Sequence, residues 1–227
     1  MKRHQALFMA VATLLFSGCG NEASDPASAP RPAAEAPQPV KTPETTSAGS
    51  SPSADFSTPE PGERLLAAPP EGWKEAFASR AAKLRMAEYI PADESNDSWT
   101  RKITFESSSA KPLPDPLDFV SGISQDQEGT CEGFESFSTF SGLENGYPTT
   151  VHLLVCRHIQ LIEKSQVTML KAIQGAEQFY VITRAQRGPP LEEGAEAISA
   201  EVIAAWSLYL RAITVCDSER PEHPCPG

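Results

Sequence analysis

The sequence predicts an α+β domain, with a mainly antiparallel sheet of about six or seven strands, two packed helices and a disordered linker before them. Three observations support this fold class. Several short runs alternate between apolar and polar residues, as strands with one buried face do. Turn-forming residues separate neighbouring runs, so hairpins dominate and no strand–helix–strand rhythm is present. Two other segments have apolar residues at helical spacing behind a capping residue.

The first part of the domain contains three predicted strands. Trp73 to Ala78 and Lys83 to Ile90 are short candidates, joined by a turn at Ser79 to Ala82. The alanine-rich stretch could instead begin a helix, because alanine has the highest helix propensity. Trp99 to Glu106 alternates clearly, which predicts one apolar and one polar face. The apolar face consists of Trp99, Ile103 and Phe105.

A helix is predicted to begin after Asp115. Asp115 is suited to the N-cap, Pro116 to the first helical position, and Asp118 adds a negative charge in the first turn. The helix should end near Gly129, just before Cys131. Its inward stripe consists of Leu117, Val120, Ile123 and Gln127.

The next predicted feature is a hairpin. Phe134 to Phe140 can pair with Thr149 to Ile159 across a turn at Glu144 to Gly146, where Asn-Gly readily supplies positive φ. Val151 to Val155 is nearly continuously apolar. That pattern is typical of a central strand buried on both faces.

A second hairpin and a helix complete the domain. Val167 to Ile173 and Gln178 to Ala185 should pair around Gln174-Gly175. After a Pro- and Gly-rich break, Ser199 is suited to cap the last helix. Its apolar positions are Val202, Trp206, Tyr209, Leu210 and Ile213.

The N-terminus has the pattern of an export signal. Lys2 and Arg3 precede an apolar stretch, Ala6 to Phe16, which is too short for the ~20 residues that a transmembrane helix needs. Ser17 and Gly18 before Cys19 resemble the lipobox of bacterial lipoproteins. The resemblance implies cleavage after residue 18, diacylation of Cys19 with fatty acids such as palmitate, and attachment to a membrane.

Two details qualify this resemblance. Phe16 stands where leucine is usual, and Leu15 lies one place too early. An ordinary secreted protein with an incidental Cys19 is the alternative. Gly20 is not the aspartate that, in the resembled class, retains lipoproteins at the inner membrane. We therefore expect an outer-membrane anchor with the domain facing the periplasm.

Residues 19–63 form a tract rich in Pro, Ala, Ser, Thr and Glu, with Phe56 as the only aromatic residue. Such a composition buries too little apolar surface to offset the entropy of ordering. Frequent prolines extend it at ~3.1 Å per residue, so it would hold a domain away from a bilayer. The predicted organisation is a signal peptide at 1–18, a tether at 19–63 and one domain at 64–227.

Four cysteines lie in the predicted domain. An even number in an oxidising compartment suggests two disulfides, for which the sequence permits three pairings. Proximity along the chain favours Cys131–Cys156 and Cys216–Cys225. Free or metal-binding thiols, including a reactive Cys225 oriented by His223, are the alternative.

Charge and motifs exclude several functions. The chain has a net charge of −11 and lacks clustered Lys and Arg, so we expect no nucleic-acid partner. It contains no serine-nucleophile elbow and no phosphate-binding glycine pattern, so we expect no nucleotide cofactor. Acidic pairs such as Asp93–Glu94 and Glu192–Glu193 lie in polar loops and are interpreted as solvated surface.

The histidines do not predict a metal site. His152, Cys156 and His158 would share one face of a strand, which invites the idea. At ~3.3 Å per residue, however, the two histidines stand ~20 Å apart and cannot meet on one ion. A metal site would need His223 or carboxylates from elsewhere. We therefore assign no metal ligand and no catalytic residue.

Two resemblances concern the domain as a whole. The order of its elements is similar to that of PsbP/Mog1-like α+β domains, which is an analogy of layout without function. Several short sequence segments also resemble those of uncharacterised exported proteobacterial proteins, and this similarity covers most of Leu65 to Pro226. That second resemblance implies a recurring domain and no catalytic assignment. The segments that carry it are 144–148 (ENGYP), 171–175 (KAIQG), 179–182 (FYVI), 215–217 (VCD) and 223–226 (HPCP).

Two functional hypotheses follow. The favoured one is a noncatalytic envelope domain on a lipid tether that binds a protein or an envelope component. Its candidate partner surface is the turn at Asn145 and Tyr147, where Tyr147 is expected to be exposed before Pro148. The alternative is an exported enzyme or small-ligand-binding protein whose site is assembled from scattered histidines and carboxylates.

Overall fold

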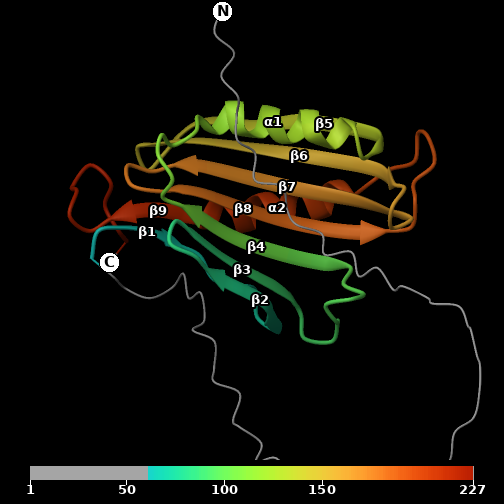
Figure 1. Ribbon diagram of the computed structural model, residues 1–227, viewed down its shortest axis with the longest axis horizontal. Coiled ribbons are helices and arrows are strands. Elements are labelled where there is room, and N and C mark those ends of the chain that lie inside the picture. The colour runs from blue at the N-terminus through green and yellow to red at the C-terminus, as the bar shows by residue number, and fades with distance from the viewer. Residues whose placement is uncertain (1–60, 227) are drawn as a thin grey trace, which may run out of the picture. The chain divides into compact units, whose positions relative to one another are not determined.

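Seven strands form one antiparallel sheet in the order β2-β3-β4-β8-β7-β6-β5, with α1 on one face and α2 on the other (Figure 1). The structure, a computed structural model, describes residues 61–226. The prediction of a mainly antiparallel α+β fold with two packed helices is confirmed. The strands are β2 (Trp73–Arg80), β3 (Leu84–Pro91), β4 (Arg101–Ser108), β5 (Glu132–Glu144), β6 (Tyr147–Ile159), β7 (Lys164–Gln174) and β8 (Phe179–Gly188). The helices are α1 (Pro116–Glu128) and α2 (Ala200–Ala212).

A second, two-stranded sheet joins the ends of the domain. β1 (Glu63–Leu66) pairs antiparallel with β9 (Thr214–Asp217), so that Glu63 lies opposite Asp217. Neither strand is predicted from the sequence, because each is four residues long and its partner is about 150 residues away along the chain. Glu63 therefore lies in a strand, although the sequence placed it at the end of the tether. The signal peptide, Cys19 and the tether up to residue 60 lie outside the described residues.

Local capping explains where α1 begins. The Asp115 side chain accepts hydrogen bonds from the backbone N–H groups of Leu117 (2.8 Å) and Asp118 (3.2 Å), and Pro116 occupies the first turn. Gly129 is the C-cap, as predicted. The helix buries Val120 completely over β6, β7 and β8. The rest of this small core consists of Leu154, Leu170, Ala172, Phe179 and Val181.

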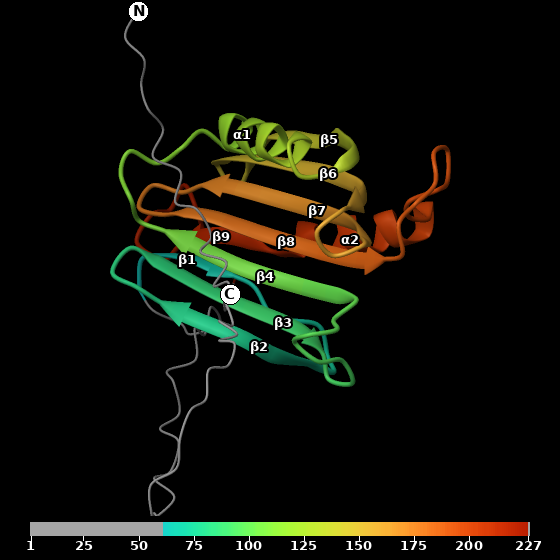
Figure 2. The same cartoon turned by 45° about the vertical axis from the view of Figure 1, so that its right-hand side comes forward.

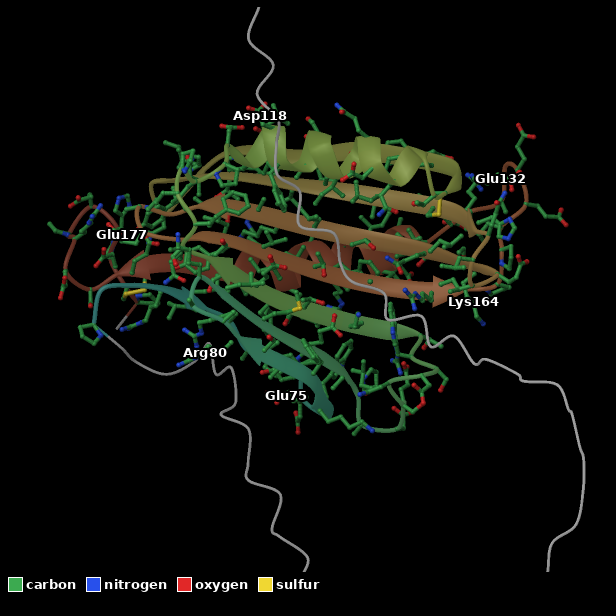
Figure 3. All side chains as sticks on the ribbon, viewed as in Figure 1. Glu75, Arg80, Asp118, Glu132, Lys164 and Glu177 are labelled. Atoms are coloured by element: carbon green, nitrogen blue, oxygen red, sulfur yellow. A yellow bond between two sulfur atoms is a disulfide. The ribbon has the colours of Figure 1, made fainter. Side chains whose placement is uncertain are left out.

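The larger core lies on the α2 face. Ser199 caps α2 by accepting a hydrogen bond from Val202, and the helix buries Trp206 and Leu210 against the sheet. The β1–β9 ribbon continues the same layer, and Figure 2 shows it behind the sheet together with α2. Charged side chains such as Glu75, Glu132 and Lys164 lie on the outside (Figure 3). The helices therefore pack apolar side chains on opposite faces of one sheet, although Leu117 of the predicted α1 stripe is 48% exposed.

The β5–β6 hairpin has the predicted turn. Asn145 and Gly146 both have positive φ, 47° and 82°, which is the conformation that a tight Asn-Gly hairpin turn requires. β6 is buried on both faces, with Leu154 under α1 and Leu153 on the α2 side. It is the second strand from the edge, however, rather than a central one.

The strand predicted from Trp73 is confirmed and the alternative helix is not formed, since β2 pairs with β3; the strand runs to Arg80, beyond the predicted Ala78. One detail near β4 differs from the expectations. Trp99 lies before the first residue of β4, so the alternation of that strand does not include it. Its ring contacts Arg187 and Lys102 on the α1 face, whereas Ile103 and Phe105 belong to the core on the α2 face.

Candidate functional site

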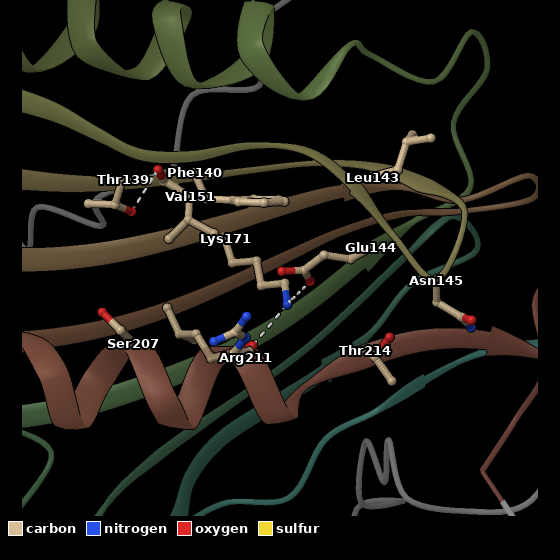
Figure 4. A pocket seen from close by; sticks show the side chains of 11 residues that line it. Thr139, Phe140, Leu143, Glu144, Asn145, Val151, Lys171, Ser207, Arg211 and Thr214 are labelled. Atoms are coloured by element: carbon tan, nitrogen blue, oxygen red, sulfur yellow. Dashed lines mark hydrogen bonds and ion pairs between the residues drawn. The ribbon is translucent and has the colours of Figure 1, made fainter.

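A groove of about 590 Å³ lies between edge strand β5 and α2. We call it the β5–α2 groove. It exists because α2 covers the middle of the sheet and leaves the edge at β5 open (Figure 4). Its size falls within the ~300–1,000 Å³ typical of ligand sites. Residues that line it include Phe140, Leu143 and Glu144 on one side and Ser207, Leu210 and Arg211 on the other.

Lys171 forms the inner end of the groove, where Figure 4 shows it directed at Glu144 and at the end of α2. It lies in β7 and is fully buried, with 0% of its surface exposed. Its Nζ donates hydrogen bonds to the carbonyl oxygens of Leu210 (2.9 Å) and Ile213 (2.7 Å), and it is ion-paired with Glu144. Burial lowers the pKa of Lys171, and the Glu144 carboxylate partly offsets this effect.

These contacts use all the hydrogen-bonding capacity of Lys171. An ammonium group has three donors, and each has an acceptor here. Two of the acceptors are carbonyls at the C-terminal end of α2, where the helix dipole favours a nearby cation, and the Leu210 carbonyl also accepts the backbone N–H of Ile213. Lys171 therefore joins β7, α2 and the β5–β6 turn, and no donor is left for a ligand. Among the charged residues that line the groove, Arg211 is exposed and Glu144 is partly buried in its ion pair.

An exposed apolar strip on β5 borders the groove. Phe137 is 48% exposed, Phe140 38% and Leu143 69%. The register with β6 shifts between Ser138 and Phe140. Because of this bulge, Phe137 and Phe140 lie opposite Leu153 and Val151, which share the α2 face, although regular alternation would place them on opposite faces.

β5 is also an edge strand. It pairs with β6 on one side only, and on its other side no strand of the described part of the chain lies next to it. The exposed side of such a strand presents backbone N–H and C=O groups that can pair with another segment. A long edge strand with exposed phenylalanine and leucine side chains is the arrangement to which extended peptides add.

The expectation that Tyr147 is exposed in the predicted partner surface at Asn145 and Tyr147 is wrong. Tyr147 is only 3% exposed, because its ring stacks on His223 with centroids 4.0 Å apart. Burial, together with the charge of Glu63, raises the pKa of Tyr147 to about 12. Asn145 is half-buried and donates to the carbonyl oxygens of Val215 and Pro224. The turn is therefore covered by the C-terminal tail rather than exposed.

The tail is held in place by a disulfide. The structure contains Cys216–Cys225, which holds the segment with His223 close to β9. His223 Nδ1 donates to the carbonyl oxygen of Asn145 at 2.8 Å, so the ring orients the turn. The second favoured pair, Cys131–Cys156, is also a disulfide and links the end of α1 to β6. The alternative of a reactive Cys225 therefore does not apply.

The histidines of β6 lie apart from the groove. His152 Nδ1 lies 3.4 Å from the Ser136 hydroxyl, and burial lowers the pKa of the ring. His158 lies between the carboxylates of Glu132 (3.3 Å) and Glu163 (3.2 Å). Within residues 61–226, no group of three or more His, Cys, Asp or Glu side chains is arranged to hold a metal ion.

One carboxylate that was interpreted as solvated surface has a structural role. Glu94 accepts hydrogen bonds from the backbone and hydroxyl of Thr100 and from the backbone and Nε of Arg101. Burial opposes its ionisation, but these hydrogen bonds outweigh burial and lower the pKa of Glu94. Glu192 and Glu193 are exposed, as predicted for a polar loop.

Comparisons with known proteins give only distant likenesses. No protein-family model and no curated protein matches the chain. Among solved structures, the Saccharomyces cerevisiae Ran-binding protein Mog1p is 12% identical, with a TM-score of 0.44 over 70% of this chain and 98% of that one. The Pseudomonas aeruginosa protein of unknown function PA94 is also 12% identical, with a TM-score of 0.39 over 66% of this chain and 88% of that one. Likeness at this level does not transfer a function.

Neither α1 nor α2, the helices between residues 61 and 226, has the length and apolar content needed to cross a bilayer.

Proposed function

We propose that this chain is a lipid-anchored protein of the bacterial cell envelope whose folded domain binds another protein at β5 and the β5–α2 groove. The observation that carries the binding proposal is the exposed apolar strip of Phe137, Phe140 and Leu143 on an edge strand. The lipobox-like residues before Cys19 support the anchor. Two disulfides in one small domain support an oxidising compartment such as the periplasm. Gly20 after the cysteine favours the outer membrane.

The proposed binding mode is strand addition. An extended segment of the partner would pair its backbone with the free edge of β5 and would place every second side chain on the α2 face. Those side chains would pack against Phe137 and Phe140, which the bulge brings onto that face. The groove beyond them is large enough to take an apolar side chain on its Val151 and Leu210 wall.

The charged residues of β5 and the β5–α2 groove indicate which charge a bound segment should carry. Glu135 of β5 is paired with Arg157 at 2.9 Å, and Glu144 is paired with Lys171. Because these acidic side chains are already neutralised, the strand edge does not select a basic segment. Arg211 is exposed at the groove and is not ion-paired within the described part of the chain. The best-matched segment is therefore uncharged and apolar at alternate positions, with one carboxylate that reaches Arg211.

A defined peptide tests the binding mode. The probe is a fluorescein-labelled strand of about nine residues with valine at alternate positions, threonine between them and a terminal glutamate. We expect saturable anisotropy changes with the full-length chain, and a loss of at least about tenfold in affinity, ~1.4 kcal/mol, for Phe140→Ser. Proline in the centre of the peptide should abolish binding, because it removes a backbone donor. Arg211→Gln should weaken binding of the peptide that ends in glutamate. Binding of the same peptide with glutamine in place of the glutamate should not change.

The matched control is Phe77→Ser. Phe77 is 49% exposed on β2, the opposite edge strand, so its replacement should leave peptide binding unchanged. Equal binding by the parent chain and Phe140→Ser would overturn the proposal. A parent chain that elutes as a dimer, and Phe140→Ser as a monomer, would also overturn it, because the occupant of the edge would then be a second copy.

The anchor has a separate test. Cells that express the parent chain or Cys19→Ser are labelled with an alkyne analogue of palmitate, and their membranes are fractionated. We expect label on the parent chain in the outer-membrane fraction, and neither label nor membrane retention for the variant. Labelling that survives in Cys19→Ser would refute this attachment site without affecting the binding proposal.

A further inference from the structure

A second pocket, of about 280 Å³, lies on the opposite face of the sheet, beside α1. α1 lies over β5, β6 and β7 and contacts the first part of β8 at Phe179 and Val181. On this face the last part of β8 and the neighbouring β4 have no helix above them (Figure 1). The flank of α1 and this open part of the sheet enclose the pocket, which we call the α1-side pocket. It has no residue in common with the β5–α2 groove. Its volume is just below the range of drug-sized ligand sites, so it suits a small molecule.

Arg187 is the central charged residue of this pocket. It lies near the end of β8, and its Nε donates to Gln166 Oε1 at 2.8 Å. Its guanidinium carbon is 3.8 Å from the centre of the Trp99 ring. The two contacts fix the plane of the guanidinium in advance of any ligand. Burial lowers the pKa of Arg187, although a guanidinium remains charged at neutral pH.

The two terminal nitrogens of Arg187 are the unused part of the group. In residues 61–226 neither nitrogen has a hydrogen-bond or ion-pair partner, and neither is sealed from solvent. A half-buried guanidinium held through Nε presents its outer nitrogens as a fork. That fork fits the two oxygens of a carboxylate.

The surrounding charges favour a monoanion. Lys102 lies 4.7 Å from the Trp99 ring centre, but it is paired with Glu88 at 2.8 Å. The region near Arg187 therefore has one net positive charge. Farther along the same face of β4 lies Glu106, whose carboxylate would repel a second negative charge. A single carboxylate fits this field better than a phosphate dianion.

The remaining lining is amphipathic. Thr104 and Thr183 lie opposite each other on β4 and β8, and their hydroxyl groups form part of the floor. Ile123 of α1, with Phe134 and Leu154, forms an apolar wall. A ligand held at Arg187 would thus have hydroxyl groups beneath it and apolar side chains beside it.

We propose that the α1-side pocket binds a small monocarboxylate with a short apolar body, held by the terminal nitrogens of Arg187 against Trp99. The carboxylate accepts the two N–H groups of the guanidinium fork. The apolar body lies over the threonine floor toward the wall formed by Ile123 and Phe134. This site is independent of the partner surface at β5.

Benzoate, benzamide and inorganic phosphate are the probes. Benzamide has the shape of benzoate without its charge, and phosphate has charge without an apolar body. Titrations of the full-length ¹⁵N-labelled chain follow the Arg187 Nε–H and Trp99 indole N–H signals. We expect saturable shifts with benzoate, binding at least tenfold weaker with benzamide, and weaker binding with phosphate than with benzoate.

Variants separate a binding role from a structural one. Arg187→Lys keeps the charge but loses the fork, and we expect at least a tenfold loss of benzoate affinity at the Trp99 signal. Thr183→Val keeps the shape of the floor without its hydroxyl and should weaken binding several-fold. Arg80→Gln is the matched control, because it removes an exposed arginine of β2 that lines neither pocket and should have no effect. Thermal unfolding verifies that each variant is folded.

Four results would overturn the proposal. The first is equal binding of benzoate and benzamide. The second is parent-like benzoate affinity in a folded Arg187→Lys chain. The third is tighter binding of phosphate than of benzoate. The fourth is benzoate shifts that are confined to residues of the β5–α2 groove.

Discussion

Replacing Lys171 by methionine should destabilise the domain by about 3 kcal/mol. The side chain is fully buried, and methionine fills nearly the same volume without the charge. The change leaves Glu144 without its cation and removes the side-chain donor of the carbonyls of Leu210 and Ile213, of which Leu210 keeps the backbone N–H of Ile213. Removing one partner of a buried ion pair costs about 3–5 kcal/mol. Glu144 is 24% exposed and can be hydrated in part, so the expected cost lies at the lower end.

A variant of Glu144, the ion-pair partner of Lys171, and a double variant test the same prediction. Glu144→Gln keeps an acceptor for Lys171 but removes the charge, so we expect a smaller loss of about 1–2 kcal/mol. In Lys171→Met/Glu144→Leu no unpaired charge remains, so the double variant should lose less stability than the two single losses added together.

Urea unfolding at 25 °C with both disulfides intact measures these free energies by linear extrapolation. Lys164→Met is a matched control, because Lys164 is exposed at the start of the same strand and its replacement should change stability by less than about 0.5 kcal/mol. A loss below about 1 kcal/mol for Lys171→Met, or strictly additive losses in the double variant, would refute the idea that this pair joins β5, β7 and α2.

Two further predictions concern carboxylates. The pKa of Glu94 is lowered in the folded state, so its contribution to stability is present above the ordinary value of 4.5 and is lost as the pH falls through the folded value. Glu94→Gln should therefore be about 1 kcal/mol less stable than the parent at pH 7 and should approach it as the pH falls below 4.5, as measured by urea unfolding at each pH. A stability gap that is constant with pH would contradict this reasoning. Glu63 accepts hydrogen bonds from the backbone N–H groups of residues 176–178 and from the Tyr180 hydroxyl, so Glu63→Gln should cost about 1–2 kcal/mol and speed amide exchange in β1. Unchanged exchange in β1, with Glu193→Gln as an exposed control, would show that this carboxylate does not hold the first strand.

Much of the fold could be predicted because its signals are local. Asp115 and Ser199 cap the helices by hydrogen bonds to residues two or three positions away, and Asn145-Gly146 forms a turn whose backbone needs positive φ. Hairpins join neighbours along the chain, so alternation also predicted their pairing. The short β1 and β9 have no such signal, because each becomes a strand only when the other lies beside it.

The candidate site was harder to predict than the fold. Phe137 and Phe140 share a face only because of a bulge, and the sequence shows no sign of that irregularity. Tyr147 was expected to be exposed in a turn, but the tail that covers it lies about 75 residues further along the chain. One signal was available: Lys171 is the charged residue of the predicted strand Val167 to Ile173, where all other residues except Thr168 are apolar. This pattern indicates a buried charge with partners from elsewhere.

The sequence by itself determined the helices and their caps, the order of the hairpins, the preference for local cysteine pairs and the expectation of export. Each depends on groups close together in the chain or on composition. Only the tertiary structure decided which faces remain open. The β5–α2 groove and the fork of Arg187 exist because each helix covers part of the sheet, and that coverage is set by contacts between residues far apart in the sequence.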